Sequence, residues 1–393
     1  MRRSSLPIVY LAVFVDLLGF GIILPILPFY AEKFGANGLW IGAILTAYSA
    51  AQFVSALFLG RLSDRIGRRP VLLASLLGSA LSLTASGFAN SLVLLLLSRL
   101  IAGAFGGSIT TAQAYVADVT TPSERTKYMG LLGASIGMGF VFGPGIGAAL
   151  SGFGFSTAAF VAAGIAALNF LVGIVKLPES RVPGQADAVR RSFRLEDVKA
   201  ALSQPTLGSA LLSTFISTIA FVAMEATFAL FGQVRFGLNP AGLGIIFTLV
   251  GIVVAVVQGG LIGRLHLRYD DRTLAGAGAV AMGVAFFLIP LMPSLTGAVV
   301  ILGLLAAGQG LVSPTLSSLI SQSSDVGEQG QTLGIGQSLS AGARAVGPLL
   351  AGWLYDRSIA LPYLLAAALM LLVVWLISRA AAPSRSQMTE AEI

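Results

Sequence analysis

Residues 60–69 read GRLSDRIGRR and place five charged residues between two apolar runs that are each long enough to cross a lipid bilayer. Charge at that density marks a membrane surface. A weaker copy, GRLHLRYDDR, occupies residues 263–272, again between two apolar runs, and begins with the same Gly-Arg-Leu. The sequence therefore predicts that one structural unit occurs twice in the chain.

The composition is that of an integral membrane protein. Of 393 residues, 56% are hydrophobic and only 10% are charged, and the mean hydropathy is +0.88. The apolar runs have the roughly 20 residues that a spanning helix needs, and they lack the roughly ten-residue alternation of a membrane β-barrel. Cysteine is absent, which excludes disulfides and thiolate metal sites. We therefore expect an all-α membrane fold.

Twelve spanning helices are predicted, in two groups of six. The first group forms a bundle within residues 1–176, and the second a bundle within residues 206–393. A polar linker at 177–205, with a short surface helix at 195–202, joins them. The predicted spans are 6–30, 39–59, 70–88, 92–117, 128–150, 157–175, 206–231, 241–262, 273–291, 295–320, 331–354 and 361–377.

The distribution of basic residues predicts the orientation. The loops on one side of the predicted spans hold only Lys33, Arg235 and Arg357, whereas the other side and both termini hold most of the 24 lysines and arginines. The positive-inside rule then places both termini in the cytoplasm. Attraction to anionic lipid headgroups accounts for the net charge of +7, so no nucleic-acid partner is expected.

The repeat keeps a constant register. Gly60 matches Gly263, Glu124 matches Glu328, Gly130 matches Gly334, and the pair 143–144 matches 347–348, all at an offset of 203 or 204 residues. Two bundles of equal orientation predict a pseudo-twofold axis along the membrane normal, with a site between them that rocking exposes to either side.

Four motifs of the N-terminal half resemble signatures of the major facilitator superfamily. They are GRLSDRIGRRPVL at 60–72, LSRLIAGAFGG around Arg99, DLLGFGIILPILP at 16–28, and the G-x8-G-x3-G-P-x2-G pattern from 130 to 147. Together they are most similar to the twelve-helix drug/proton antiporter branch, near its tetracycline-efflux-like group. The C-terminal half resembles the family more loosely.

The resemblance implies roles in conformational gating for seven residues. A charge cluster of Asp64, Arg68 and Asp118 would hold the inner side shut, while Arg61, Arg65 and Arg69 are expected to be solvated. Asp64 and Arg68 are four residues apart, which predicts a shared helical face. Small residues allow helix backbones to approach closely in lipid, and proline permits a bend. The predicted gating residues are Gly60, Asp64, Arg68, Asp118, Gly139, Gly143 and Pro144.

Four ionisable residues fall inside predicted spans: Asp16, Arg99, Glu225 and Arg344. Each is costly if it faces lipid, so each should face a partner or a wet cavity. Asp16 would lie about 15 Å from the inner surface and Arg99 about 10 Å from the outer, which lets their long side chains meet. We expect Asp16 and Glu225 to exchange protons under the influence of Arg99 and Arg344. Static buried pairs, and an interfacial carboxylate at Glu225, are the alternatives.

By analogy with the family, the first, fourth, seventh and tenth predicted spans should line the substrate cavity. Each aromatic candidate has ordinary packing as its alternative. The polar candidates are Gln52, Gln113, Tyr115, Gln258, Gln309 and Ser313, and the aromatic ones are Phe20, Phe221, Phe228 and Phe231. The only histidine, His266, is expected on the surface of a cytoplasmic loop, so no metal site is predicted. Ser82 stands where the tetracycline exporters carry an aspartate, which argues against a site for metal-chelated tetracycline.

The leading hypothesis is a non-enzymatic secondary transporter of the inner membrane that exports a small amphipathic or lipophilic compound in exchange for protons. The proton gradient supplies the energy, so no cofactor is expected, and the partners are the substrate, protons and lipids. A monomer is expected from the family. The alternatives are a transporter of a sugar, metabolite or lipid with the same fold, and a membrane enzyme or receptor. No Walker loop, HExxH or nucleophile-elbow motif supports an enzyme.

Overall fold

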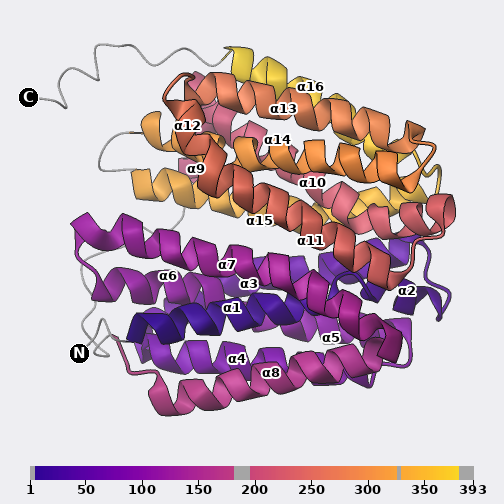
Figure 1. Cartoon of the computed structure of the whole chain (residues 1–393). Coiled ribbons are helices and arrows are strands. Elements are labelled where there is room, and N and C mark those ends of the chain that lie inside the picture. Colours follow the sequence, from indigo (N-terminus) through magenta and orange to yellow (C-terminus); the bar gives the residue numbers. More distant parts are fainter. Residues whose placement is uncertain (1–4, 181–194, 325–328, 380–393) are drawn as a thin grey trace, which may run out of the picture. The chain divides into compact units, whose positions relative to one another are not determined.

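The computed structural model describes residues 5–180, 195–324 and 329–379, and every regular element in these ranges is helical (Figure 1). The first part of the chain forms α1 (Leu6–Ile23), α2 (Leu27–Glu32), α3 (Gly38–Ile66), α4 (Arg68–Gly87), α5 (Leu92–Ala104), α6 (Ser108–Val119), α7 (Pro122–Leu150), η2 (Ser151–Phe153) and α8 (Phe155–Lys176). The second part forms α9 (Leu195–Ser203), α10 (Pro205–Phe236), α11 (Pro240–Val256), η3 (Val257–Leu261), α12 (Ile262–His266), α13 (Asp271–Leu288), η4 (Ile289–Leu291), α14 (Leu295–Gln322), α15 (Gln329–Tyr355) and α16 (Leu361–Arg379).

Eleven helical segments in the described ranges are long and apolar enough to cross a membrane. They correspond to eleven of the twelve predicted spans. The twelfth, α15, has 27 residues but falls below the apolarity of the others, because it carries Arg344 and many glycines and small polar residues. The all-α membrane fold is therefore confirmed, and the short helix expected within the linker is present as α9. Residues 181–194 of the predicted linker lie outside the described residues.

Three spans that we expected to be continuous are interrupted. The span 6–30 breaks after Ile23, and α2 carries Pro28 in its first turn, where a proline costs no hydrogen bond. The span 92–117 breaks between α5 and α6, close to Gly106 and Gly107. The span 241–262 contains the π-helical segment η3, which includes Gln258. Apolar periodicity did not reveal these breaks, because each run is strongly apolar on both sides of the break, although Pro25, the pair 106–107 and Gln258 are visible signals there.

Contacts divide the chain into two compact units. Unit 1 comprises Met1–Arg190, Ala226–Ile252 and Pro348–Asp356, and unit 2 comprises Arg191–Glu225, Val253–Gly347 and Arg357–Ile393. Within unit 1, α1 packs along α7 and α4 packs along α8 (Figure 1). Within unit 2, α13 packs against α14 and α16. Each unit therefore contains segments from both predicted bundles. The boundary between the bundles at 177–205 stays a prediction.

The contact between α1 and α7 depends on bare backbone. A Cβ atom built on Gly139 would lie 2.6 Å from Leu17 Cβ, and one on Gly143 would lie 2.7 Å from the Cα of Gly21. Pro144 lies within the continuous helix α7, and its Cδ is 3.1 Å from a Cβ built on Gly21. The glycines of the 130–147 pattern, which lie on α7, thus allow the close approach that we expected.

The repeat reproduces this packing less tightly in unit 2. Gly347 on α15 occupies the position that the repeat matches with Gly143, and a Cβ built there would lie 3.6 Å from Val222 Cβ on α10. That distance is an ordinary van der Waals contact. The same pair of helices therefore meets in both copies, but only the first copy requires glycine.

We predict that Gly143→Val destabilises the protein by about 1–3 kcal/mol, because the new side chain must displace α1 from α7. The apparent melting temperature of purified protein in detergent or nanodiscs measures the effect. Gly133→Val is the matched control on the same helix, since a Cβ at Gly133 meets no atom within 4 Å. Equal melting temperatures for the two variants would contradict the role of the α1–α7 contact.

Candidate functional site

Asp16 lies in α1 and is held by hydroxyl groups. The hydroxyl of Ser108, the first residue of α6, donates to Asp16 Oδ2, and Ser79 on α4 also hydrogen-bonds to this carboxylate. No cation forms an ion pair with Asp16 among the described residues. Three helices of unit 1 therefore converge on a carboxylate whose partners are neutral, an arrangement that suits a group that exchanges protons.

Arg99 does not meet Asp16, contrary to our expectation from their depths. Its side chain is 3% exposed on α5, and its Nη2 donates to the hydroxyl of Ser86 on α4. Its Nε has no hydrogen-bond partner. Tyr48 on α3 lies near enough to interact with it electrostatically. Depth along the membrane was a poor guide because it does not specify which face of each helix carries the side chain.

A row of serines on α4 lies between the two ionisable groups. Ser82 donates to the carbonyl of Ser79 at 2.9 Å, and Ser86 donates to the carbonyl of Ser82 at 2.8 Å. Ser79 contacts Asp16 at one end of this serine ladder, and Ser86 contacts Arg99 at the other. The ends are seven residues apart, or about 10 Å along the helix. The spacing of three and four residues was a visible signal for a shared polar face that our sequence reasoning missed.

Two of the predicted cavity residues come together beside Arg99. The rings of Phe20 and Tyr48 stack with centroids 4.8 Å apart, and Gln52 Nε2 donates to the hydroxyl of Tyr48 at 3.2 Å. All three side chains are half-buried. Phe140 approaches Phe20 edge-on at 6.1 Å. Phe20 and Gln52 thus belong to one aromatic and polar patch, together with Tyr48 and Phe140, which the sequence reasoning did not single out.

Three other predicted cavity residues are core residues instead. Tyr115 is fully buried and its hydroxyl contacts Ser5 and the carbonyl of Pro178. Phe228 and Phe231 on α10 are buried with ring centroids 6.0 Å apart. The packing alternative therefore holds for these three. Gln113 on α6 is exposed in unit 1 and remains compatible with a cavity.

Unit 2 contains a second set of predicted residues. Arg344 on α15 interacts electrostatically with Glu225 on α10, so the expected acid and base come together in this unit. Phe221, one turn earlier on α10, is half-buried. The structure thus supports an acid–base pair in the second copy, whereas the first copy keeps its acid and base apart.

The remaining polar candidates of unit 2 lie on α14 and in η3. Gln309 Oε1 is buried without a hydrogen-bond partner, and Ser313, four residues later on α14, is exposed. Gln258 is exposed within η3. Short π-helical segments occur often at functional sites, because they re-aim side chains. All three residues stay candidates for substrate contact.

The predicted charge cluster is present in unit 1. Arg68 is 1% exposed, and its guanidinium lies 2.6 Å from Asp64 and 2.9 Å from Asp118. Asp64 and Arg68 do not share a helix as expected, because the chain turns at Gly67 with φ +103° and α4 begins at Arg68. The structure gives no steric reason for glycine at position 60, where an added Cβ meets no atom within 4 Å.

Glu179 completes this charge cluster and was not foreseen. Its two carboxylate oxygens accept from the backbone N–H groups of Arg68 and Arg69 at 2.8 and 3.1 Å. A carboxylate at the start of a helix satisfies free N–H groups and complements the helix dipole. Arg69, which we expected to be solvated, donates to the carbonyl of Ile174 at the end of α8. The segment after α8 is therefore fastened to the start of α4.

A second carboxylate caps α3 in the same manner. Asp356 accepts from the backbone N–H groups of Gly38 and Leu39 at 2.7 and 2.9 Å within unit 1. Glu32, at the end of α2, lies nearby in the chain, and burial raises the pKa of its carboxyl despite a hydrogen bond from Gln233. These contacts join segments that are far apart in the sequence, so no local pattern predicted them.

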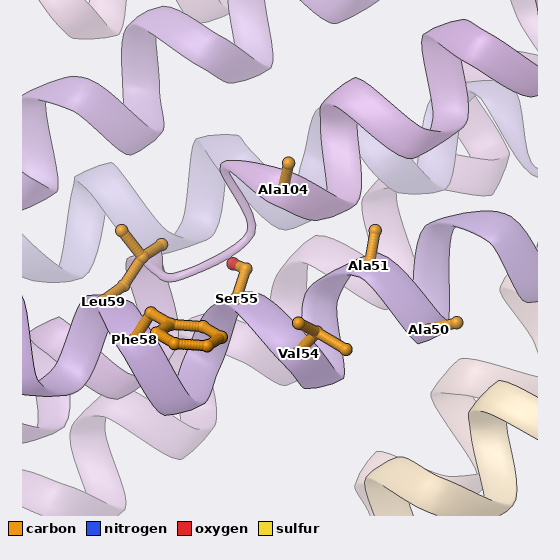
Figure 2. A pocket seen from close by; sticks show the side chains of 7 residues that line it. All are labelled: Ala50, Ala51, Val54, Ser55, Phe58, Leu59 and Ala104. Carbon is orange, nitrogen blue, oxygen red and sulfur yellow. The ribbon is translucent and has the colours of Figure 1, made fainter.

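An apolar pocket of about 490 Å³ lies between α3 and α5 (Figure 2). Figure 2 shows that most of its side chains project from α3, with Ala104 contributed by α5. None of the predicted cavity residues lines it. Its lining consists of Ala50, Ala51, Val54, Ser55, Phe58, Leu59 and Ala104.

Comparisons with known proteins agree with the motifs. A model of the Major Facilitator Superfamily matches residues 9–345 and 260–392. The chain is 28% identical to Multidrug resistance protein 2 of Bacillus subtilis, over 91% of this chain and 90% of that protein. It is 32% identical to the class E tetracycline resistance protein of Escherichia coli, over 88% and 86%. Among solved structures, the human organic anion transporter MFSD10 superposes with a TM-score of 0.72 at 28% identity, over 96% of this chain and 99% of that one.

We predict that Glu179→Ala lowers stability by about 0.5–2 kcal/mol, as expected for the loss of a helix cap. Glu196→Ala is the control, because Glu196 is an exposed carboxylate in the first turn of α9. Thermal unfolding of purified protein measures both variants. An unchanged melting temperature for Glu179→Ala would show that the cap does not stabilise α4.

Proposed function

Since the chain belongs to the major facilitator superfamily and is a multi-pass membrane transporter, we propose that it exports a small amphipathic or lipophilic compound in exchange for protons. Its relatives include proteins named for multidrug and tetracycline resistance, which supports an efflux role. The observation that carries the proposal is the environment of Asp16, a membrane-embedded carboxylate whose partners among the described residues are the hydroxyls of Ser108 and Ser79. We further propose that the transporter resides in the inner membrane with both termini in the cytoplasm.

Asp16 can change protonation state without breaking a tight ion pair. When it is ionised, the hydroxyls of Ser108 and Ser79 donate to it, and when it is protonated it can donate a hydrogen bond itself. Exposure to one side of the membrane after the other would then let it take up and release a proton. The substrate competes with the proton by favouring the ionised form of the site.

Arg99 acts on Asp16 from a distance in this scheme. At about 10 Å, the length of the serine ladder, two opposite charges attract by about 1.7 kcal/mol for an effective dielectric constant of about 20. That attraction favours the ionised carboxylate without holding it in that state. Glu225 and Arg344, which lie close enough to interact, form the second exchangeable pair.

The patch of Phe20, Tyr48, Gln52 and Phe140 is the proposed contact surface for the compound. Stacked aromatic rings bind flat apolar groups, and the amide and phenol supply hydrogen bonds. A metal-chelated tetracycline is not the proposed substrate. Ser82, where those exporters carry an aspartate by resemblance, is buried and bonded to its own helix.

We predict that Asp16→Asn lowers uphill transport by about tenfold or more while leaving binding of the compound in place, because asparagine cannot exchange a proton. Proteoliposomes with an imposed pH gradient and a panel of lipophilic dyes provide the measurement. Glu196→Gln, an exposed carboxylate outside the predicted spans, is the control and should transport like the wild type.

Accumulation by Asp16→Asn at the wild-type rate would remove Asp16 from the scheme. Wild-type accumulation that persists when an ionophore collapses the pH gradient would instead favour a transporter of another kind. The same assay therefore separates the role of Asp16 from proton coupling itself.

A further inference from the structure

The second copy of the loop motif contains a buried carboxylate with one unsatisfied oxygen. Asp271, the first residue of α13, is a buried residue of unit 2. Its Oδ2 accepts from Ser318 Oγ and Gln322 Nε2, both at 2.7 Å. Its Oδ1 is buried and has no hydrogen-bond partner in the described part of the chain. Burying a carboxylate oxygen without a hydrogen-bond donor costs free energy. A donor that faces Oδ1 would therefore stabilise this site.

The group that faces this oxygen is the only histidine of the chain. His266 Nε2, at the end of α12, lies 3.4 Å from Asp271 Oδ1. A neutral imidazole at that distance is a weak partner at best, whereas a protonated one carries a full positive charge and donates from both nitrogens. Histidine is the side chain whose charge changes most readily between pH 5 and 8.

Within the described ranges, the other charged groups around His266 do not replace it as the partner of Asp271. Asp270 caps α13 by accepting from the N–H of Thr273, and Arg272 donates to the carbonyls of Ile377 and Ser378 on α16. Arg264 and Arg268 belong to the same short segment as His266. The packed helix α14 contributes only the neutral Ser318 and Gln322.

The repeat gives this cluster a counterpart in the first copy. The register of 203 or 204 residues matches His266 with Ser63, Asp271 with Arg68, and Gln322 with Asp118. In the first copy the guanidinium of Arg68 binds both Asp118 and Ser63, with Ser63 Oγ at 2.6 Å. The same three positions therefore meet in both units. The first copy has a permanent ion pair, and the second has a carboxylate beside a titratable base.

We propose that His266, Asp271 and Gln322 form a proton-operated latch, the pH-dependent counterpart of the Arg68 cluster. Protonation of His266 forms an ion pair with Asp271 and fastens the end of α12 to the start of α13 and, through Gln322 and Ser318, to α14. The ion pair forms only when the imidazole is protonated, so the latch is closed at low pH and opens as the pH rises.

The latch also makes the rate of transport depend on the pH at the cytoplasmic side, a feedback by the transported protons. This inference rests on the proposed proton exchange. The loop that carries His266 lies on the predicted cytoplasmic side, where exchange delivers protons. Protons that accumulate there close the latch, and the added ion pair restrains α12 against α14 and slows turnover. No step of the substrate cycle itself uses His266.

The test compares wild-type protein with His266→Gln and His266→Lys in nanodiscs at pH 6.0 and 8.0. Hydrogen–deuterium exchange of the peptide that covers residues 262–275 reports the latch directly, provided that the purification tag contains no histidine. We expect at least a threefold slower exchange at pH 6.0 than at pH 8.0 in the wild type, after correction for intrinsic rates. His266→Gln should exchange fast at both values, and His266→Lys slowly at both.

The position of the base is tested by Arg268→Gln, which removes a neighbouring positive charge and should keep the wild-type pH dependence. A pH dependence that survives in His266→Gln, or that is absent from the wild type, overturns the latch. For the feedback, at a fixed pH difference across the membrane, wild-type proteoliposomes should transport at least twofold more slowly with the cytoplasmic face at pH 6.0 than at pH 8.0, and His266→Gln should lose this difference. Equal slowing of transport in the wild type and in His266→Gln overturns the feedback. If the wild type accumulates no compound in response to a pH gradient, the proposed function fails. The hydrogen–deuterium exchange result still tests the latch in that case.

Discussion

An ionisable side chain inside a membrane must find a partner or water, and the way this chain meets that constraint at Asp16 shapes the rest of unit 1. Hydroxyls from α4 and α6 converge on the carboxylate, while Arg99 binds the same face of α4 two turns away. The serine ladder thus separates the acid from the base. A direct ion pair would favour the ionised carboxylate more strongly, whereas hydroxyl partners serve both states.

Two carboxylates cap the first turns of helices that lie far from them in the sequence. Glu179 caps α4 from the segment after α8, and Asp356 caps α3 from the end of α15. Each satisfies two backbone N–H groups that a helix start leaves free. In the loop motif, the first copy adds a permanent guanidinium, and the second substitutes a carboxylate beside an imidazole. Duplication preserved the positions of these contacts while the charges changed.

The sequence predicted the fold well because its strongest signals are long apolar runs, glycine patterns and the distribution of charge. Apolar run length located the spans, and the glycines at 139 and 143 correctly indicated close helix contact. Breaks such as the one between α5 and α6 do not shorten the apolar run, and the sequence marks that one only by the glycines at 106 and 107. The aromatic candidates also split: Phe20 is half-buried in a patch and Phe228 is a core residue, and both lie inside apolar runs, so run length does not distinguish them. Contacts made by Glu179 and Asp356 depend on tertiary structure, which no local pattern encodes.

The most direct test of the account is the number of protons released when purified protein binds a transported compound in weakly buffered solution. If Asp16 exchanges its proton for the compound, the wild type releases protons on binding, and Asp16→Asn releases about one fewer for each molecule bound. Equal release by the two proteins, at equal occupancy, would contradict the central claim that Asp16 is a site of proton exchange.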